Sequence, residues 1–378
     1  MKMSFLDSKK NNMKNIVFIS PNRYHFNGVV SDAQSDVFFH FKNSLKEINN
    51  KITVAKFFKN KKGYQELDLK FLKKKVDKNS VVFIDGNISI EDNTIYPLEL
   101  FYLLKNSKSK IVCFVPDLIK QLKFEKWVKL SNLIIGFSKI AVDWANKFYK
   151  TTKFKFYPSL PLKLYKKQSL NDFLKRPYDI GYIGSDKRFR SKFLSELKKK
   201  TKIDVKLLIV NTDNRLKNYK TTESYLKEIS KCKFYFCTRA SVYENYSENI
   251  FNLNFREGRF ANRVSEAIIC GCVPLYWQPK VDNSFLMPFK KKLLYSRKKI
   301  IPSHWGTKGN LASLPYDNMN KNLKNGIEVV NDVNDAIAKV KNLKKSYFSS
   351  KLKYGRKIYK TYISPISFYN FVKSKLND

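Results

Sequence analysis

Three runs of β-branched and aromatic residues constrain the fold of this chain more than any other feature. They cover Val81–Asp85, Ile111–Pro116 and Leu133–Ser138. A strand with one face in water alternates apolar and polar residues, whereas these runs are apolar on both faces, as in parallel strands that helices cover on two sides. Together with an earlier strand at Ile16–Ser20 and the amphipathic stretches between the runs, they predict a doubly wound α/β sheet.

A second series of the same kind follows. Strands are expected at 178–185, 205–210, 233–237 and 327–330, and helices at 189–199, 222–232 and 333–343. Between the two series, Pro158, Pro161 and a basic, polar stretch up to Pro177 interrupt the periodicity and predict a linker. A length of 378 residues suits two domains of roughly 150–200 residues each.

The expected organisation is therefore two Rossmann-like domains that face a cleft, lined by the carboxyl ends of their strands. Residues 1–160 form the first domain, 161–177 the linker and 178–358 the second domain. The tail, residues 359–378, is expected to be a helix that crosses back to the first domain.

The formal net charge of +42 would suit a nucleic-acid or membrane partner. However, 63 of the 74 basic residues are Lys and 11 are Arg, and Asn is also abundant. A Lys and Asn bias of this kind is typical of solvated surfaces encoded by an AT-rich genome. A basic surface for anionic lipid or polysaccharide is the other interpretation. Nucleic acid is disfavoured because no zinc-finger, RNP-like or basic-heptad pattern accompanies the charge.

The five cysteines lie in apolar runs and predict buried free thiols in a reducing compartment. Cys270 and Cys272 do not have zinc spacing, and the chain has three His. The lysine-rich N-terminus leads directly into the first strand, and no apolar run approaches the roughly 20 residues of a membrane helix. We expect a cytoplasmic protein that is soluble or peripheral to the inner membrane face.

The segment from Asn262 to Trp277 predicts a short helix, a glycine stop and a buried strand. Asn262 suits the N-cap and Gly271 the position after the helix. Arg263 and Glu266 are three residues apart and share a face. With the partial positive charge of a helix N-terminus, Arg263 could hold a diphosphate and Glu266 could accept hydrogen bonds from ribose or sugar hydroxyls. The same spacing equally fits an ion pair on a helix surface.

The strand Phe234–Cys237 with Arg239, the Arg263-x-x-Glu266-Ala267 helix and the run Gly271–Pro274 resemble the donor-binding core of exostosin-like GT-B glycosyltransferases. The strand at 179–185 is similar to the start of the donor domain in CgeB-like proteins, and 275–281 is similar to bacterial GT-B fucosyltransferases. Thr238 and Ala240 stand where the family has Pro and Gly. The resemblance covers about 60 residues. It implies that Glu266 binds the donor ribose and Arg263 a phosphate.

Further donor-binding candidates lie at strand ends. The turn with Gly184, Ser185 and Arg188 lets a ligand approach the backbone and supplies a basic side chain for a diphosphate. Arg239, at another strand end, is a similar candidate for binding the diphosphate. An ordinary basic turn is the alternative. The chain contains no Asp-x-Asp pair, the usual metal-binding motif of GT-A enzymes. A GT-B enzyme needs none, so neither a metal nor a cofactor is expected.

An inverting enzyme also needs a general base near the acceptor hydroxyl. His25, Asp32 and Asp117 follow predicted strands of the first domain and are the candidates, although each could equally be a loop or capping residue. The predicted function is transfer of a sugar from a nucleotide-diphospho-sugar to a glycan or lipid-linked acceptor in surface polysaccharide synthesis. The alternatives are a nucleotide-sugar epimerase on the same fold and a basic nucleic-acid-binding protein.

Overall fold

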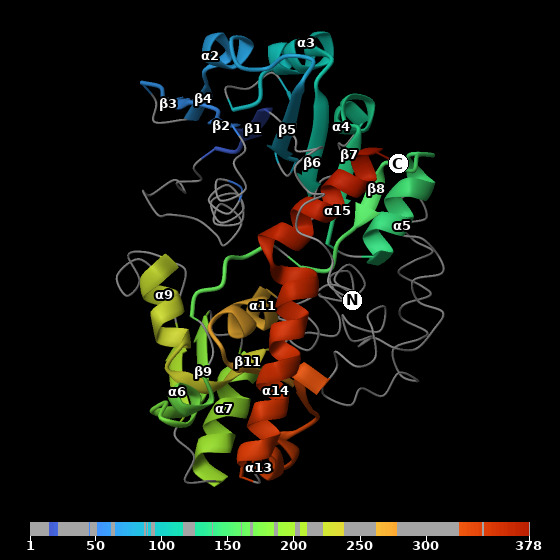
Figure 1. Ribbon diagram of the computed structural model, residues 1–378. Coiled ribbons are helices and arrows are strands. Elements are labelled where there is room, and N and C mark those ends of the chain that lie inside the picture. The colour runs from blue at the N-terminus through green and yellow to red at the C-terminus, as the bar shows by residue number, and fades with distance from the viewer. Residues whose placement is uncertain are drawn as a thin grey trace, which may run out of the picture. The chain divides into compact units, whose positions relative to one another are not determined.

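The computed structural model divides the chain into two compact units. Unit 1 comprises Met1–Phe137, Ala145–Tyr157 and Pro365–Asp378, and unit 2 comprises Ser138–Trp144 and Pro158–Ser364. The structure describes residues 15–21, 45, 51–61, 65–86, 88, 90–91, 95–115, 125–137, 139–159, 161–166, 169–184, 188–200, 205–209, 222–237, 262–277, 325–341 and 344–377. Figure 1 labels the elements along the chain.

Unit 1 contains a six-stranded sheet in which all neighbouring strands are parallel. Its strands, in spatial order, are β2 (Lys51–Val54), β1 (Asn15–Ile19), β5 (Ser80–Asp85), β6 (Lys110–Val115), β7 (Leu133–Gly136) and β8 (Phe154–Phe156). The helices that alternate with them are α2 (Leu69–Lys73), α3 (Leu98–Ser107), α4 (Glu125–Leu130) and α5 (Lys139–Phe148). A small antiparallel pair, β3 (Phe57–Lys59) and β4 (Gln65–Leu67), accompanies the sheet.

The apolar runs build the core of unit 1. Every residue of β5 is buried, as are the five apolar residues of β6, because the strands are covered on both faces. Phe18 on β1 stacks on Phe83 of β5 with ring centroids 5.3 Å apart. The C-terminal helix α15 (Pro365–Asn377) also belongs to this core, since the ring of Phe368 lies 5.0 Å from that of Phe114 on β6.

Unit 2 contains a five-stranded parallel sheet. Its strands, in spatial order, are β10 (Val205–Ile209), β9 (Tyr178–Gly184), β11 (Cys232–Cys237), β12 (Val273–Trp277) and β13 (Glu328–Val330). The described helices of this unit are α6 (Leu170–Leu174), α7 (Arg188–Lys200), α9 (Thr222–Ile229), α11 (Asn262–Ile269), α13 (Val333–Lys341), α14 (Lys345–Ile358) and the π-helical turn η6 (Tyr359–Ile363).

Alternate residues of β11 enter two different cores, one on each face of the sheet. Phe234 and Phe236 pack with residues of α7, α13 and α14, whereas Tyr235 and Cys237 pack with residues of α9, α11 and η6. The sheet is thus a middle layer between two helical layers (Figure 1). This arrangement confirms the predicted α/β class with parallel sheets, and the predicted strands of unit 2 are present with ends shifted by one or two residues.

Residues 161–177, expected as a linker, are part of unit 2. The backbone N–H of Leu162 donates to the carbonyl of Ile363, and that of Tyr165 donates to Ile269 at the end of α11. The short helix α6 places Phe173 in the core, fully buried. The local sequence, rich in proline and lysine, does not reveal these contacts, because the partner residues lie far away along the chain.

The five cysteines are free and buried, in agreement with the expected thiols. Burial raises the pKa of Cys237 and Cys270, with Glu266 adding to the rise, so both thiols stay protonated at neutral pH. Within the described part of the chain, no helix is long and apolar enough to cross a membrane.

Replacing Gly181 with Ala is expected to destabilise unit 2. A Cβ at this position of β9 would lie 2.1 Å from the Cys232 sulfur and 3.0 Å from its Cβ, so either the buried Cys232 side chain or the strand must shift. Overpacking of this kind costs about 1–3 kcal/mol. Urea unfolding followed by circular dichroism measures the change.

Gly355→Ala is the matched control, because a Cβ on this residue of α14 meets no atom within 4 Å. A helical Ala in place of Gly stabilises by up to about 1 kcal/mol. If Gly181→Ala proved as stable as Gly355→Ala, the close approach of β9 to Cys232 would be disproved.

Candidate functional site

Helix α11 is held at its C-terminal end by a Schellman motif. Gly271 has a φ of 71°, the left-handed conformation expected of the residue after a helix. Its N–H donates to the carbonyl of Ile268, and the N–H of Cys272 donates to Ala267 over 2.8 Å. The predicted glycine stop is confirmed. The helix begins at Asn262, which was predicted to be the N-cap, so it starts one residue earlier than expected.

The two candidate donor residues of α11 lie in one partly buried hydrogen-bond network. Arg263 donates through Nη1 to the carbonyl of Ile183, to the hydroxyl of Tyr235 at 3.0 Å and to that of Tyr225 at 3.4 Å. Tyr225 in turn donates to Oε2 of Glu266 at 2.7 Å. Both charged side chains belong to the described part of the chain, and no ion pair joins them. The interpretation as a surface ion pair is therefore wrong.

Tyr235 connects this network to the end of strand β9. Its hydroxyl donates to the carbonyl of Ile183 at 3.1 Å and lies 3.3 Å from the Tyr225 hydroxyl. The guanidinium of Arg263 also lies 4.9 Å from the centre of the Tyr182 ring, a cation–π distance. The arginine thus binds two consecutive residues near the carboxyl end of β9.

Burial and the neighbouring groups together determine the protonation states within the network. Desolvation opposes the charge of Arg263, but the surrounding Tyr235, Tyr225, Tyr182 and Glu266 outweigh it and hold the pKa of the guanidinium well above its ordinary value. Burial also raises the pKa values of both tyrosine hydroxyls. The site therefore keeps a permanent cation and two protonated hydroxyls across the physiological range of pH.

The network lies at the topological switch point of the unit 2 sheet. In order along the chain, β9 is the first strand and β10 the second, yet β10 and β11 flank β9 on opposite sides. The connections that leave the carboxyl ends of β9 and β11 therefore run to opposite sides, toward β10 and β12, and ligands of open α/β sheets bind at such a crevice outside the carboxyl ends of the strands. Figure 1 labels β9 and α11, two of the elements that supply the network here.

One carboxylate oxygen of Glu266 is available for a further bond. The residue is only 9% exposed, and its Oε2 is occupied by Tyr225. Its Oε1 accepts no hydrogen bond from any residue that the structure describes. Nε and Nη2 of Arg263 likewise have no hydrogen-bond partner among these residues. The arrangement offers an acceptor and cationic donors a short distance apart on one helix.

The other predicted site residues are described in part or not at all. Gly184 ends β9, Arg188 begins α7 and Asn262 begins α11, but the side chains of Arg188 and Asn262 are not described. Outside the described residues lie Ser185, Arg239 and the three candidate bases His25, Asp32 and Asp117. Arg263 and Glu266 are thus the two predicted side chains that the structure brings together.

Tyr225 and Tyr235 complete the site and were not singled out in the sequence. A buried tyrosine usually finds a partner for its hydroxyl, so Tyr235 in the apolar run 234–237 carried a weak signal of this kind. Tyr225 lies 41 positions from Glu266. Its contact depends on the packing of α9 against α11, which no local pattern shows.

No protein-family model and no curated protein matches the sequence. Among solved structures, the chain is similar to Acinetobacter baumannii MurG, with 7% identity over 96% of this chain and 99% of that one and a TM-score of 0.42. It is also similar to AviGT4, a glycosyltransferase involved in avilamycin A biosynthesis. That comparison has 9% identity over 97% of each chain and a TM-score of 0.47.

Removal of the Tyr225 hydroxyl is expected to destabilise unit 2. Tyr225→Phe leaves Oε2 of the buried Glu266 without its donor, and an unsatisfied buried acceptor costs about 1–3 kcal/mol. The urea midpoint should fall. Tyr354→Phe on α14 is the control, because no described residue bonds its half-buried hydroxyl. Equal midpoints for the two variants would show that the Tyr225–Glu266 bond contributes nothing to stability.

Proposed function

We propose that the protein is a glycosyltransferase of the GT-B type. It would move a sugar from a nucleotide-diphospho-sugar to a hydroxyl of a glycan or lipid-linked acceptor in surface polysaccharide synthesis. Unit 2 would bind the donor at the carboxyl end of its sheet. The observation that carries the proposal is the Arg263–Tyr235–Tyr225–Glu266 network at the switch point of that sheet.

Glu266 is the proposed contact for the donor ribose. Tyr225 fixes the carboxylate through Oε2, so Oε1 is held in one orientation and can accept hydrogen bonds from a vicinal diol. An acceptor fixed in advance loses less conformational entropy on binding than a freely rotating one. The resemblance to exostosin-like enzymes assigns Glu266 the same role.

Arg263 is proposed to stabilise the diphosphate. Its Nη1 is committed to Ile183 and Tyr235, so any direct contact would come from Nη2 or Nε, and the remaining contribution is the positive field of a desolvated charge. The Gly184 turn with Ser185 and Arg188, together with Arg239 and Asn262, would complete the phosphate site. These cations would offset the charge of the departing diphosphate without a metal ion.

Unit 1 is proposed to bind the acceptor and to supply the general base from among His25, Asp32 and Asp117. The base would take the proton of the acceptor hydroxyl as its oxygen attacks the anomeric carbon and the bond to the diphosphate breaks. The protein would act in the cytoplasm, in solution or at the inner face of the membrane.

Glu266→Gln is expected to weaken donor binding with little loss of stability. The amide oxygen can still accept from Tyr225, but the charge that strengthens a bond to a ribose hydroxyl is removed, which corresponds to a loss of about tenfold in affinity. A thermal-shift screen against UDP-, GDP-, CMP- and dTDP-sugars identifies the donor. Calorimetry then compares the variants.

Glu228→Gln on α9 is the control, since this glutamate pairs with Lys231 over 2.5 Å and bonds no member of the network through a described contact. Equal affinity of the two variants for the donor would refute the site. Incubation with the donor and no acceptor separates the transferase from an epimerase, because epimerised nucleotide-sugar would refute transfer.

Substitution of the general base should lower kcat without weakening donor binding. We expect one of Asp32→Asn, His25→Gln and Asp117→Asn to reduce kcat by about 100-fold or more, within the range contributed by general base catalysis. The donor affinity of that variant should stay within twofold of the original. If all three variants kept full activity, the base would lie elsewhere.

A further inference from the structure

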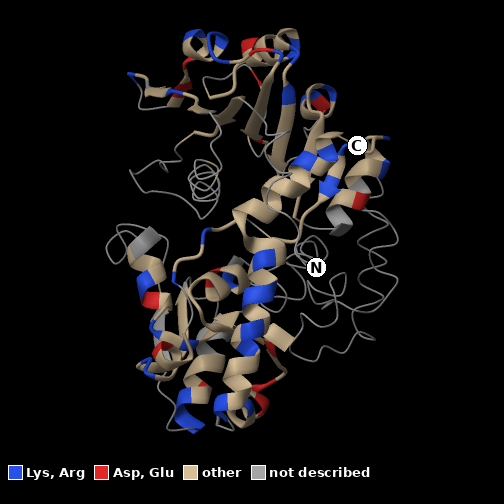
Figure 2. Ribbon diagram, viewed as in Figure 1, with Lys and Arg blue, Asp and Glu red and all other residues tan. Residues whose placement is uncertain are grey.

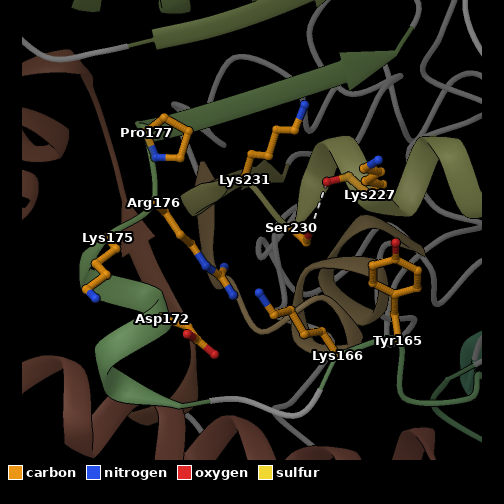
Figure 3. Close-up of a pocket in the computed structure, with 9 residues that line it drawn as sticks. All are labelled: Tyr165, Lys166, Asp172, Lys175, Arg176, Pro177, Lys227, Ser230 and Lys231. Atoms are coloured by element: carbon orange, nitrogen blue, oxygen red, sulfur yellow. Dashed lines mark hydrogen bonds between the residues drawn. The ribbon is translucent and has the colours of Figure 1, made fainter.

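Unit 2 contains a pocket at the amino ends of β9 and β11, opposite the carboxyl ends that carry the proposed donor site. It has a volume of about 760 Å³, and Pro177 and Lys231, which directly precede β9 and β11, form part of its wall. We call it the amino-end pocket. Figure 3 shows its lining side chains, which come from α6 and the segments before and after it, and from the end of α9 and the residues that follow it.

Cations dominate the lining of the amino-end pocket. Its lining includes five cationic residues but one carboxylate, that of Asp172; the cationic residues are Lys166, Lys175, Arg176, Lys227 and Lys231. Lys231 pairs with Glu228. For Lys166, Lys175 and Lys227, no carboxylate of a described residue lies within ion-pair distance. Most of the positive charge in the pocket is therefore not neutralised by described residues.

Arg176 distinguishes this pocket from an ordinary lysine-rich surface. The residue is only 8% exposed. Its guanidinium donates to the carbonyls of Cys232 at 2.7 Å and Cys270 at 3.1 Å and to the sulfur of Cys272 at 3.3 Å, all of which are neutral acceptors. Its Nε is buried and has no hydrogen-bond partner among the described residues. A buried cation with no counter-ion in the described part of the chain produces a strong positive field at the wall of the pocket.

Two of the lysines in the pocket, Lys175 and Lys227, also stabilise helix ends, which is a simpler explanation for their positions than ligand binding. Lys227 lies in the last turn of α9, and Lys175 caps the C-terminal end of α6, where cations stabilise the helix dipole. That role needs no hollow and no buried arginine. Figure 2 shows Lys and Arg distributed along the helices of both units.

We propose that the amino-end pocket binds a ligand that carries phosphate groups, at a site separate from the proposed donor site. A volume of about 760 Å³ falls within the range of small-molecule pockets and exceeds the needs of a single phosphate. Lysine ammonium groups bind phosphate as point charges, and the four lysines of the lining suit an oligophosphate or a phospholipid head group. The proposal does not depend on sugar transfer.

The test compares two triple variants with the same loss of charge. The pocket variant is Lys166→Gln with Lys175→Gln and Lys227→Gln, all exposed side chains whose replacement should leave the fold intact. The control is Lys198→Gln with Lys199→Gln and Lys200→Gln, exposed at the end of α7 in the same unit. Circular dichroism and thermal melting establish that both remain folded.

Two probes distinguish the sources of the phosphate. Calorimetry measures the affinity for inorganic tripolyphosphate, and co-sedimentation measures binding to phosphatidylglycerol vesicles against phosphatidylcholine vesicles. We expect the pocket variant to bind at least one of the two probes about tenfold more weakly or worse, and the control to stay within twofold. Loss confined to tripolyphosphate indicates a soluble ligand, and loss confined to the vesicles indicates a lipid head group. Equal effects of the two variants, or no effect of either, would overturn the proposal.

Discussion

The arrangement of unit 2 depends on Arg263, a partly buried arginine whose charge must be satisfied. Moving a guanidinium out of water costs several kcal/mol unless hydrogen bonds replace those to the solvent. Arg263 obtains them from the carbonyl of Ile183 and the hydroxyl of Tyr235, while Tyr225 relays the contact to Glu266. These partners come from α9, β9, β11 and α11, so the hydrogen bonds around one charge connect four elements of the unit.

This constraint connects structure to the proposed chemistry. The amino-terminal half of α11 presents Arg263 and Glu266 at the end of the sheet, and the Schellman turn at Gly271 fixes the other end of the helix. A site on a helix held at both ends loses little entropy when a ligand binds. The same helix ends where Arg176 reaches Cys270, so the proposed donor site and the amino-end pocket contact opposite ends of one element.

The strands and the class of fold could be predicted from the sequence because runs such as Val81–Asp85 are apolar on both faces, which few other structures allow. The end of α11 could also be predicted, since Gly271 supplies the positive φ. The packing of residues 161–177 into unit 2 could not be predicted, because Phe173 and Arg176 contact their partners only after the strands assemble. For the same reason, the spacing of Arg263 and Glu266 predicted a shared face but not the two tyrosines between them.

Arg176, which is buried, and Arg263, which is partly buried, both donate to neutral groups. Arg176 bonds two carbonyls and a thiol, and Arg263 bonds a carbonyl and two hydroxyls. In a chain with 32 acidic residues against 74 basic ones, carboxylates are scarce partners. Dipoles of the backbone and of protonated tyrosines neither titrate near neutral pH nor dissociate when salt is added. The hydrogen bonds of these two arginines are thereby insulated from the ionic composition of the surroundings, while the exposed lysines of this strongly cationic protein respond to it.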